Sequence, residues 1–172
     1  MSSTYQVGVV FEGLADASGL VSGPLPGAVV SEADALTTVR ASVRAPRPAA
    51  AVSRLVERVT KAVPAAVPVR VDKDLVSVSD IAQRAGRTRE SVRLLAEAKR
   101  GPGGFPAPVG VAGDEIKVWP WSEVRDWFDK VLGIDLGENG VPPLTAAVLD
   151  VSFGTRRSPE LTFALGRGWL KY

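Results

Sequence analysis

The chain has 172 residues, of which 45% are hydrophobic and 23% are charged, a composition typical of a folded protein with one domain or two small ones. Cysteine and histidine are both absent, which excludes disulfides, thiolate metal sites and every catalytic pair built on either residue. The formal net charge is only +2, so the chain as a whole has no strong bias towards polyanions.

Signatures of enzymes and of membrane proteins are also missing from the sequence. The carboxylates are scattered, and there is neither a GxxxxGK[ST] phosphate loop nor a GxGxxG motif after a strand. No apolar run reaches about 18 residues, and no charged N-terminal region precedes an apolar stretch. We therefore expect a non-enzymatic cytoplasmic protein with no cofactor, no metal site, no membrane span and no signal peptide.

The first predicted domain, residues 1–74, alternates strands with one clear helix. The apolar run YQVGVVF predicts a strand at 5–11, and the Gly-, Ser- and Pro-rich stretch at 14–27 predicts a loop with at most a short turn of helix. Apolar residues spaced by three and four predict a helix at 48–63. Further strands are expected at 28–31, 36–44 and 67–71. These elements favour a small α+β unit, ferredoxin-like in outline, although a second helix is hard to find.

The role of this first domain stays open between a packing or dimerisation module and a ligand-sensing module. Eight basic against seven acidic residues from Met1 to Asp74 give it a net charge of +1, so it has no marked DNA-binding character.

Residues 78–95 (VSDIAQRAGRTRESVRLL) predict two helices that meet at a sharp turn. Ile81 and Ala82 lie on the apolar face of the first helix, and Val92 and Leu95 lie on that of the second. Gly86 supplies the positive φ that the turn between them requires.

The starts of both helices carry capping residues. Ser77 and Asp80 have the spacing of a capping box, and Thr88 is a favourable N-cap for the second helix. Both helix starts are therefore marked in the sequence.

A hairpin and a third helix are expected to follow. The stretch GPGGFPAP at 101–108 predicts a bend, strands are expected at 109–112 and 116–119, and a helix is expected at 121–132. Trp119, Trp121 and Trp127 are expected in the core, because this small domain has few other large side chains to fill its centre.

The residues Ala82, Gly86 and Val92 match the spacing of the helix-turn-helix motif, which the chain therefore resembles. With the segments LVSVSDIAQRAG, RESVRLL, FPAP and IKVWPWSEVRDWF, the resemblance extends to MerR-like and excisionase (AlpA-like) winged helix-turn-helix domains and covers about residues 75–133. Arg87 departs from it, because the family places an apolar residue after the glycine. Asp114 and Glu115 depart from it too, because carboxylates at the tip of a wing repel phosphate.

The resemblance implies that the second helix enters the major groove of DNA. Its N-terminal residues would then meet base edges, with Arg89 and Arg93 pairing with guanine and Glu90 exposed beside them. The residues expected mainly at phosphates are Thr88, Ser91, Arg84, Arg87, Lys99, Arg100 and Lys117, the last of them on the wing. From Arg84 to Arg100 six basic residues stand against two acidic ones, a net charge of +4, which favours this interpretation over a plain helical hairpin.

The third predicted domain, residues 134–172, begins with a Gly- and Pro-rich linker. Pro143 suits the first turn of a helix, but a strand at 147–153 fits the pattern equally well. The apolar content of this extension predicts packing on its own chain or on a second copy.

These observations predict an α+β protein that binds double-stranded DNA in a sequence-specific manner, as a transcriptional regulator associated with the nucleoid. A homodimer or higher homo-oligomer is expected, because one small reading domain binds weakly alone. Two alternatives stay open: an excisionase-like or partition-type architectural DNA-binding protein, and a protein-interaction adaptor that keeps the winged fold without binding DNA.

Overall fold

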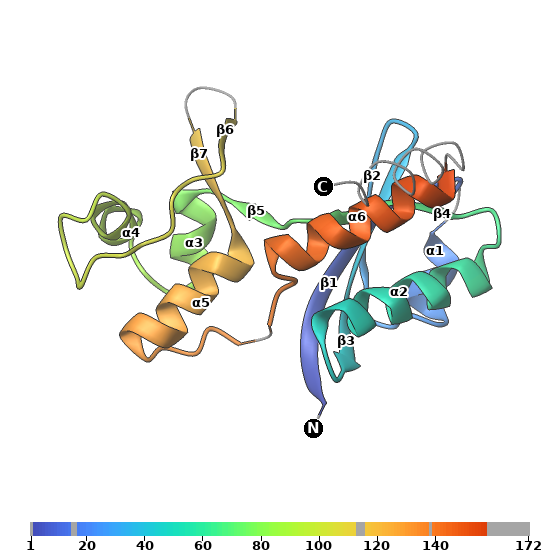
Figure 1. Cartoon of the computed structure of the whole chain (residues 1–172), viewed down its shortest axis with the longest axis horizontal. Coiled ribbons are helices and arrows are strands. Elements are labelled where there is room, and N and C mark those ends of the chain that lie inside the picture. Colours follow the sequence, from blue (N-terminus) through green and yellow to red (C-terminus); the bar gives the residue numbers. More distant parts are fainter. Residues whose placement is uncertain (1, 15–16, 113–115, 138, 158–172) are drawn as a thin grey trace, which may run out of the picture. The chain divides into compact units, whose positions relative to one another are not determined.

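The computed structural model describes residues 2–14, 17–112, 116–137 and 139–157. The chain is of mixed α+β type with two antiparallel sheets and divides into two compact units (Figure 1). Unit 1 comprises Met1–Asp72 with Leu144–Tyr172, and unit 2 comprises Lys73–Pro143. The α+β class expected from the sequence is confirmed.

Unit 1 contains a four-stranded antiparallel sheet in the order β2-β3-β1-β4. Its elements are β1 (Ser3–Glu12), α1 (Ser18–Ser22), β2 (Val29–Ala33), β3 (Leu36–Ala45), α2 (Pro48–Ala62), β4 (Val67–Asp72) and, from the end of the chain, α6 (Pro143–Arg157). The stretch expected as a loop holds the short helix α1, whose Leu20 is buried in the core.

The core of unit 1 lies between the sheet and α2. Val9 of β1 stands opposite Val39 of β3, both are fully buried, and Val52 and Leu55 of α2 are equally buried. Along β3 buried residues alternate with more exposed ones, as one covered face of a sheet requires. The strand predicted at residues 36–44 is thus confirmed.

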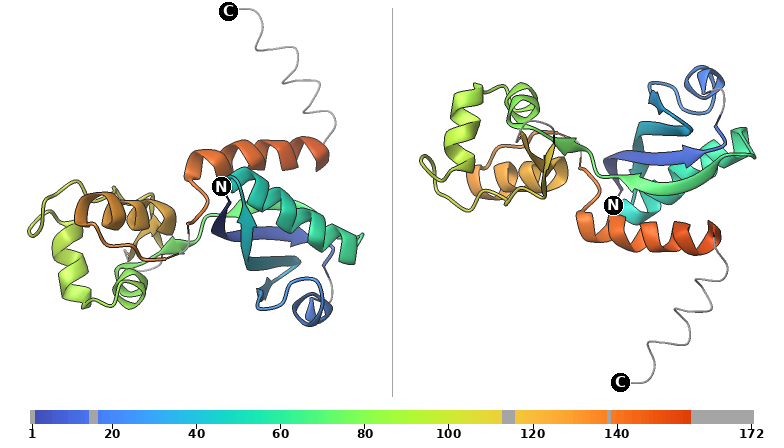
Figure 2. Two further views of the ribbon diagram at one scale, coloured as in Figure 1. Left: turned by 90° about the horizontal axis from the view of Figure 1, so that it is seen from below. Right: turned by 90° about the horizontal axis from the view of Figure 1, so that it is seen from above.

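Helix α6 resolves the choice between helix and strand near the end of the chain. Ala146 and Phe153 are buried, and the Asp150 Oδ1 atom accepts a hydrogen bond from the backbone N–H of Val71 at 2.6 Å. Val71 belongs to the edge strand β4, which among the described residues has no strand beside it on its outer side to accept its N–H groups. Helix α6, which lies along unit 1 in Figure 2, therefore supplies a hydrogen-bond acceptor to this edge strand.

Unit 2 contains three helices and a three-stranded antiparallel sheet in the order β5-β7-β6. Its elements are β5 (Leu75–Val76), α3 (Val78–Arg84), α4 (Arg89–Ala96), β6 (Gly110–Ala112), β7 (Ile116–Pro120) and α5 (Trp121–Leu132). The predicted helices and hairpin are present, and β5 is an additional strand whose Val76 pairs with Trp119.

The three clustered tryptophans lie in the core of unit 2, as predicted: Trp119, Trp121 and Trp127 are 2%, 7% and 6% exposed. Two of the indoles also donate hydrogen bonds, Trp119 to the Pro106 carbonyl at 3.0 Å and Trp127 to the Gly103 carbonyl at 3.1 Å. The bend at 101–108 is thereby tied to the core.

The segment after α5 also packs in unit 2. Arg125 is only 8% exposed and donates from Nε to the Gly137 carbonyl at 3.1 Å, while Ile134 and Leu136 pack against the core. The predicted extension at 134–172 is thus divided between the two units at Leu144.

Candidate nucleic-acid interface

The turn between α3 and α4 is closed by backbone hydrogen bonds around a left-handed glycine. Gly86 has φ +61°, its N–H donates to the Gln83 carbonyl at 3.3 Å, and the Arg87 N–H donates to the Ala82 carbonyl at 2.8 Å. These two bonds form a Schellman motif, in which the residue after the helix cap adopts positive φ. The local sequence therefore fixes the direction in which α4 leaves α3.

Both helices begin at the capping residues that the sequence marks. The Ser77 hydroxyl accepts from the Asp80 N–H at 3.3 Å, and the Asp80 carboxylate accepts from the Ser77 N–H at 2.8 Å. The Ser77 hydroxyl also donates to this carboxylate at 2.7 Å, and together with the Ser77 N–H it holds the pKa of the Asp80 carboxyl below its usual range. At α4, the Thr88 hydroxyl accepts from the Ser91 N–H at 3.1 Å. The capping box and the Thr88 N-cap are both confirmed.

Arg87 fills the position where the resembled family has an apolar residue. Its guanidinium carbon lies 5.4 Å from the centre of the Phe128 ring, and the residue is half-buried. A guanidinium over an aromatic face makes a cation–π contact and covers apolar surface with its stem. The departure from the family pattern is therefore compatible with the turn.

Arg84 is engaged within unit 2. Its two terminal nitrogens donate to the Asp74 carboxylate at 2.6 and 2.9 Å, and its guanidinium carbon lies 5.0 Å from the centre of the Trp121 ring. Asp74 itself has φ +44°, and its carbonyl accepts from the Trp121 N–H at 3.0 Å. Arg84 thus fastens the first residues of unit 2 to α3 and α5.

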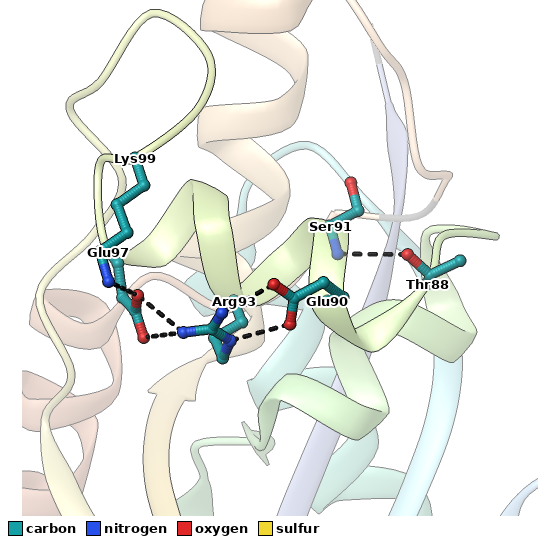
Figure 3. Close-up of polar contacts among 6 residues, drawn as sticks. All are labelled: Thr88, Glu90, Ser91, Arg93, Glu97 and Lys99. Carbon is teal, nitrogen blue, oxygen red and sulfur yellow. Dashed lines mark hydrogen bonds and ion pairs between the residues drawn. The ribbon is translucent and has the colours of Figure 1, made fainter.

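Arg93 lies between two carboxylates on the surface of α4 (Figure 3). It donates to both oxygens of Glu90 at 2.7 and 2.9 Å and to both oxygens of Glu97 at 2.8 and 2.9 Å. Lys99 adds an ion pair to Glu97 at 2.8 Å. These contacts lower the pKa of both glutamates and raise that of Arg93.

This network changes the electrostatics expected of α4. One glutamate stands three residues before Arg93 and the other four residues after it, so helix geometry brings all three together on one face. Two carboxylates and the cations Arg93 and Lys99 sum to no net charge. The spacing of the two glutamates from Arg93 can be seen in the sequence. A count of charges along the chain, however, does not show that Arg93 pairs with both of them.

The second helix and the hairpin border the same hollow, which has a volume of about 400 Å³. It is lined by Arg93 of α4, by Glu97 at the C-cap of that helix, and by Ile116, Lys117 and Trp119 of β7. Ser77, Val78, Ser79, Ala96 and Pro108 complete the lining. Sequence reasoning did not single out Ser79, which reaches the site only through this arrangement.

The other predicted site residues lie on the surface around this hollow and on α4. Arg89, Arg100 and Lys117 are exposed, and none of these three side chains has a hydrogen bond or ion pair within the part of the chain that the structure describes. Ser91 is half-buried and points to the other side of α4 from Arg93 (Figure 3). Asp114 and Glu115, which were predicted to form the tip of a wing, lie outside the described residues.

Comparisons with protein-family models, with curated proteins and with solved structures gave no match. Within the described ranges, no helix is long and apolar enough to cross a membrane, and no group of acidic side chains could hold a metal ion.

Proposed function

We propose that unit 2 is a winged helix-turn-helix domain that binds double-stranded DNA in a sequence-specific manner, as part of a transcriptional regulator. In this proposal α4 enters the major groove, and the β6–β7 hairpin is the wing beside the phosphate backbone. The observation that carries it is the shared hollow: α4 and the hairpin present Arg93 and Lys117 to one side of unit 2. A duplex can then meet both elements at once.

The roles within this interface follow from the exposure of each side chain and from the contacts that it makes among the described residues. Arg89 is in the first turn of α4, is exposed, and forms no side-chain contact among the described residues, so it is the arginine best able to pair with guanine. Lys99, Arg100 and Lys117 hold phosphates, together with Thr88, Ser91 and Arg87. Arg84 contributes mainly by fixing the start of unit 2.

We propose that unit 1 has a ferredoxin-like fold and mediates dimerisation. The element order β1-α1-β2-β3-α2-β4, with the sheet order β2-β3-β1-β4, supports this assignment, and α1 takes the place of the helix that the sequence did not reveal. A dimer would present two reading helices to two half-sites.

The experiment that tests the proposal is selection of bound duplexes from a random DNA pool, followed by binding of the winners at several salt concentrations. We expect convergence on a motif and a falling affinity with salt, because phosphate contacts release counterions. The variant Arg89→Ala should lose discrimination at one base pair, and Lys117→Ala should weaken binding to all sequences alike. Arg58→Ala on α2 of unit 1 is the charge-matched control and should behave as the unchanged protein.

Two results would replace this proposal. Steep salt dependence without a motif, with a ladder of shifted bands on one fragment, would indicate an architectural DNA-binding protein. Absence of DNA binding at low salt would leave the protein-interaction adaptor.

A further inference from the structure

We propose that Glu90 reads a cytosine in the DNA site and that Arg93 is the positioning residue that holds it. This inference rests on the proposed DNA-binding function and assigns the specificity of α4 to a carboxylate as well as to an arginine.

Glu90 lies on the side of α4 that faces away from the core. Val92 and Leu95 form the buried side of the helix, and at 100° per residue Glu90 is 200° and 140° of rotation away from them. The Glu90 side chain is 62% exposed, whereas the Arg93 side chain is 46% exposed. When the outer face of α4 lies in a major groove, Glu90 therefore faces the base edges more directly than Arg93 does.

Arg93 fixes the orientation of this carboxylate and neutralises its charge. Its Nε and one terminal nitrogen donate to the two oxygens of Glu90, while the other terminal nitrogen donates to Glu97. A bidentate arginine–carboxylate pair restricts the rotation of the glutamate. The paired charge also lowers the repulsion that a free carboxylate would meet between two phosphate strands.

The pair leaves Glu90 able to accept further hydrogen bonds. An ionised carboxylate offers about four lone-pair sites, and Arg93 occupies one on each oxygen. Arg93 in turn has most of its donors directed at the two glutamates. In this arrangement Glu90 is an oriented hydrogen-bond acceptor with lone pairs still available, whereas Arg93 would have to break existing contacts to pair with guanine.

A carboxylate held in this orientation selects cytosine among the bases that face the major groove. Cytosine presents its N4 amino group as a donor. Adenine also donates from N6, but it places the acceptor N7 beside that group, which repels a carboxylate; guanine presents acceptors only, and thymine an acceptor beside its methyl group.

The test is the random-pool selection repeated with Glu90→Gln. An amide pairs bidentately with adenine N6 and N7, so we expect the preferred base at one position to change from cytosine to adenine, with roughly a tenfold change in relative affinity, since good contacts of this kind discriminate by about 1 to 3 kcal/mol. Glu57→Gln on α2 is the matched control and should select the original motif.

Arg93 is tested by two further variants. Arg93→Ala should weaken the cytosine preference at the same position and leave the preference assigned to Arg89 intact, whereas Arg93→Lys should restore part of it, because an ammonium group keeps one ion pair but not the bidentate geometry. Circular dichroism of each variant checks that α4 remains folded.

The outcomes separate this inference from the proposal beneath it. If the unchanged protein selects a motif and Glu90→Gln selects the same one, the reading role of Glu90 is overturned while DNA binding stands. If Arg93→Ala keeps the full cytosine preference, the positioning role is overturned. If no duplex is selected at all, both proposals are overturned.

Discussion

Arg84 makes two contacts that a lysine could not both replace: a forked ion pair with Asp74 and a planar contact over Trp121. We expect Arg84→Ala to lower the free energy of unfolding of unit 2 by about 1 kcal/mol. The loss is modest because the ion pair is partly exposed, but the variant removes both the ion pair and the contact with Trp121. Urea unfolding measures the loss. In the proposed DNA binding, the same variant should lower the salt dependence of the affinity by less than the loss of one phosphate contact would.

A double-mutant cycle with Asp74→Ala gives the coupling within this pair. The expected structural role would be ruled out by two results together: a coupling energy near zero, and a salt dependence of DNA affinity reduced by as much as one lost phosphate contact predicts. Arg84 would then act at phosphate. Lys117→Ala is the control for unfolding alone: its side chain is exposed and has no partner among the described residues, so the free energy of unfolding should not change.

Asp80 gives unit 2 a pH dependence with a defined sign. Its pKa is lower in the folded state than in an unfolded chain, because the Ser77 hydroxyl and N–H donate to its carboxylate. The stabilisation is therefore complete above the unfolded value and is lost as the pH falls through the folded one. We expect Asp80→Asn to destabilise unit 2 by about 1 kcal/mol at neutral pH.

The difference between Asp80→Asn and the unchanged protein should begin to shrink below about pH 4, where the carboxylate becomes protonated in the unfolded chain. It should disappear once the pH has fallen through the lower pKa of the folded state. Urea unfolding followed across pH measures this convergence. Asp129→Asn, at an exposed position of α5, is the control and should show no such pattern. A difference that stays constant down to low pH would rule out the capping carboxylate as its cause.

At the scale of elements, two glycines around α4 differ in what an added methyl group would meet. Gly86 has φ +61°, and a Cβ atom there would have no neighbour within 4 Å. Gly101 has φ +82°, and its Cβ atom would lie 2.8 Å from the Leu95 side chain, which is buried. We expect Gly86→Ala to cost about 1 kcal/mol for the backbone alone.

Gly101→Ala should cost the same backbone term and in addition about 1 to 3 kcal/mol for overpacking. Urea unfolding followed by far-ultraviolet circular dichroism, which reports on both units, gives the ranking. Gly27→Ala, at φ +77° in open space of unit 1, controls for the backbone term elsewhere in the chain. Equal losses at Gly86 and Gly101 would mean that Leu95 moves aside without cost.

The same scale shows which features could be predicted from the sequence. The caps at Ser77 and Thr88, the turn at Gly86 and the alternation along β3 depend on neighbours a few residues away, and all of them are present. What could not be predicted depends on distant partners: β5 exists only because β7 pairs with it, and α6 is fixed where Asp150 meets β4.

The candidate site divides in the same way. Arg89, Glu90 and Arg93 could be named from a short pattern, because the helical period places them away from the buried residues of α4. Their pairing with one another, the contact of Arg84 with Asp74 and the hollow beside Lys117 could not, because each depends on side-chain placement in three dimensions.

The division of the whole molecule into two units allows the units to unfold separately. The chain completes the strands of unit 1 by Asp72, forms unit 2 with the next 71 residues, and contributes α6 to unit 1 only afterwards. Multidomain chains of this kind need not unfold in one step. A change in α6 should therefore act on unit 1 alone.

Asp150→Ala removes the acceptor of the Val71 N–H, and Val71 is fully buried. We expect unit 1 to lose about 1 to 3 kcal/mol, the cost of an unsatisfied buried donor. In a Trp169→Phe background the remaining tryptophans, Trp119, Trp121 and Trp127, all belong to unit 2, so fluorescence reports on that unit while far-ultraviolet circular dichroism reports on both.

The expected result is an earlier transition by circular dichroism and an unchanged midpoint by fluorescence. Asp150→Asn keeps a carbonyl oxygen as acceptor and should recover much of the loss, which distinguishes the hydrogen bond from a general effect of substitution in α6. If both signals shift together by the same amount, the two units unfold as one cooperative body, and the stability of unit 2 depends on helix α6.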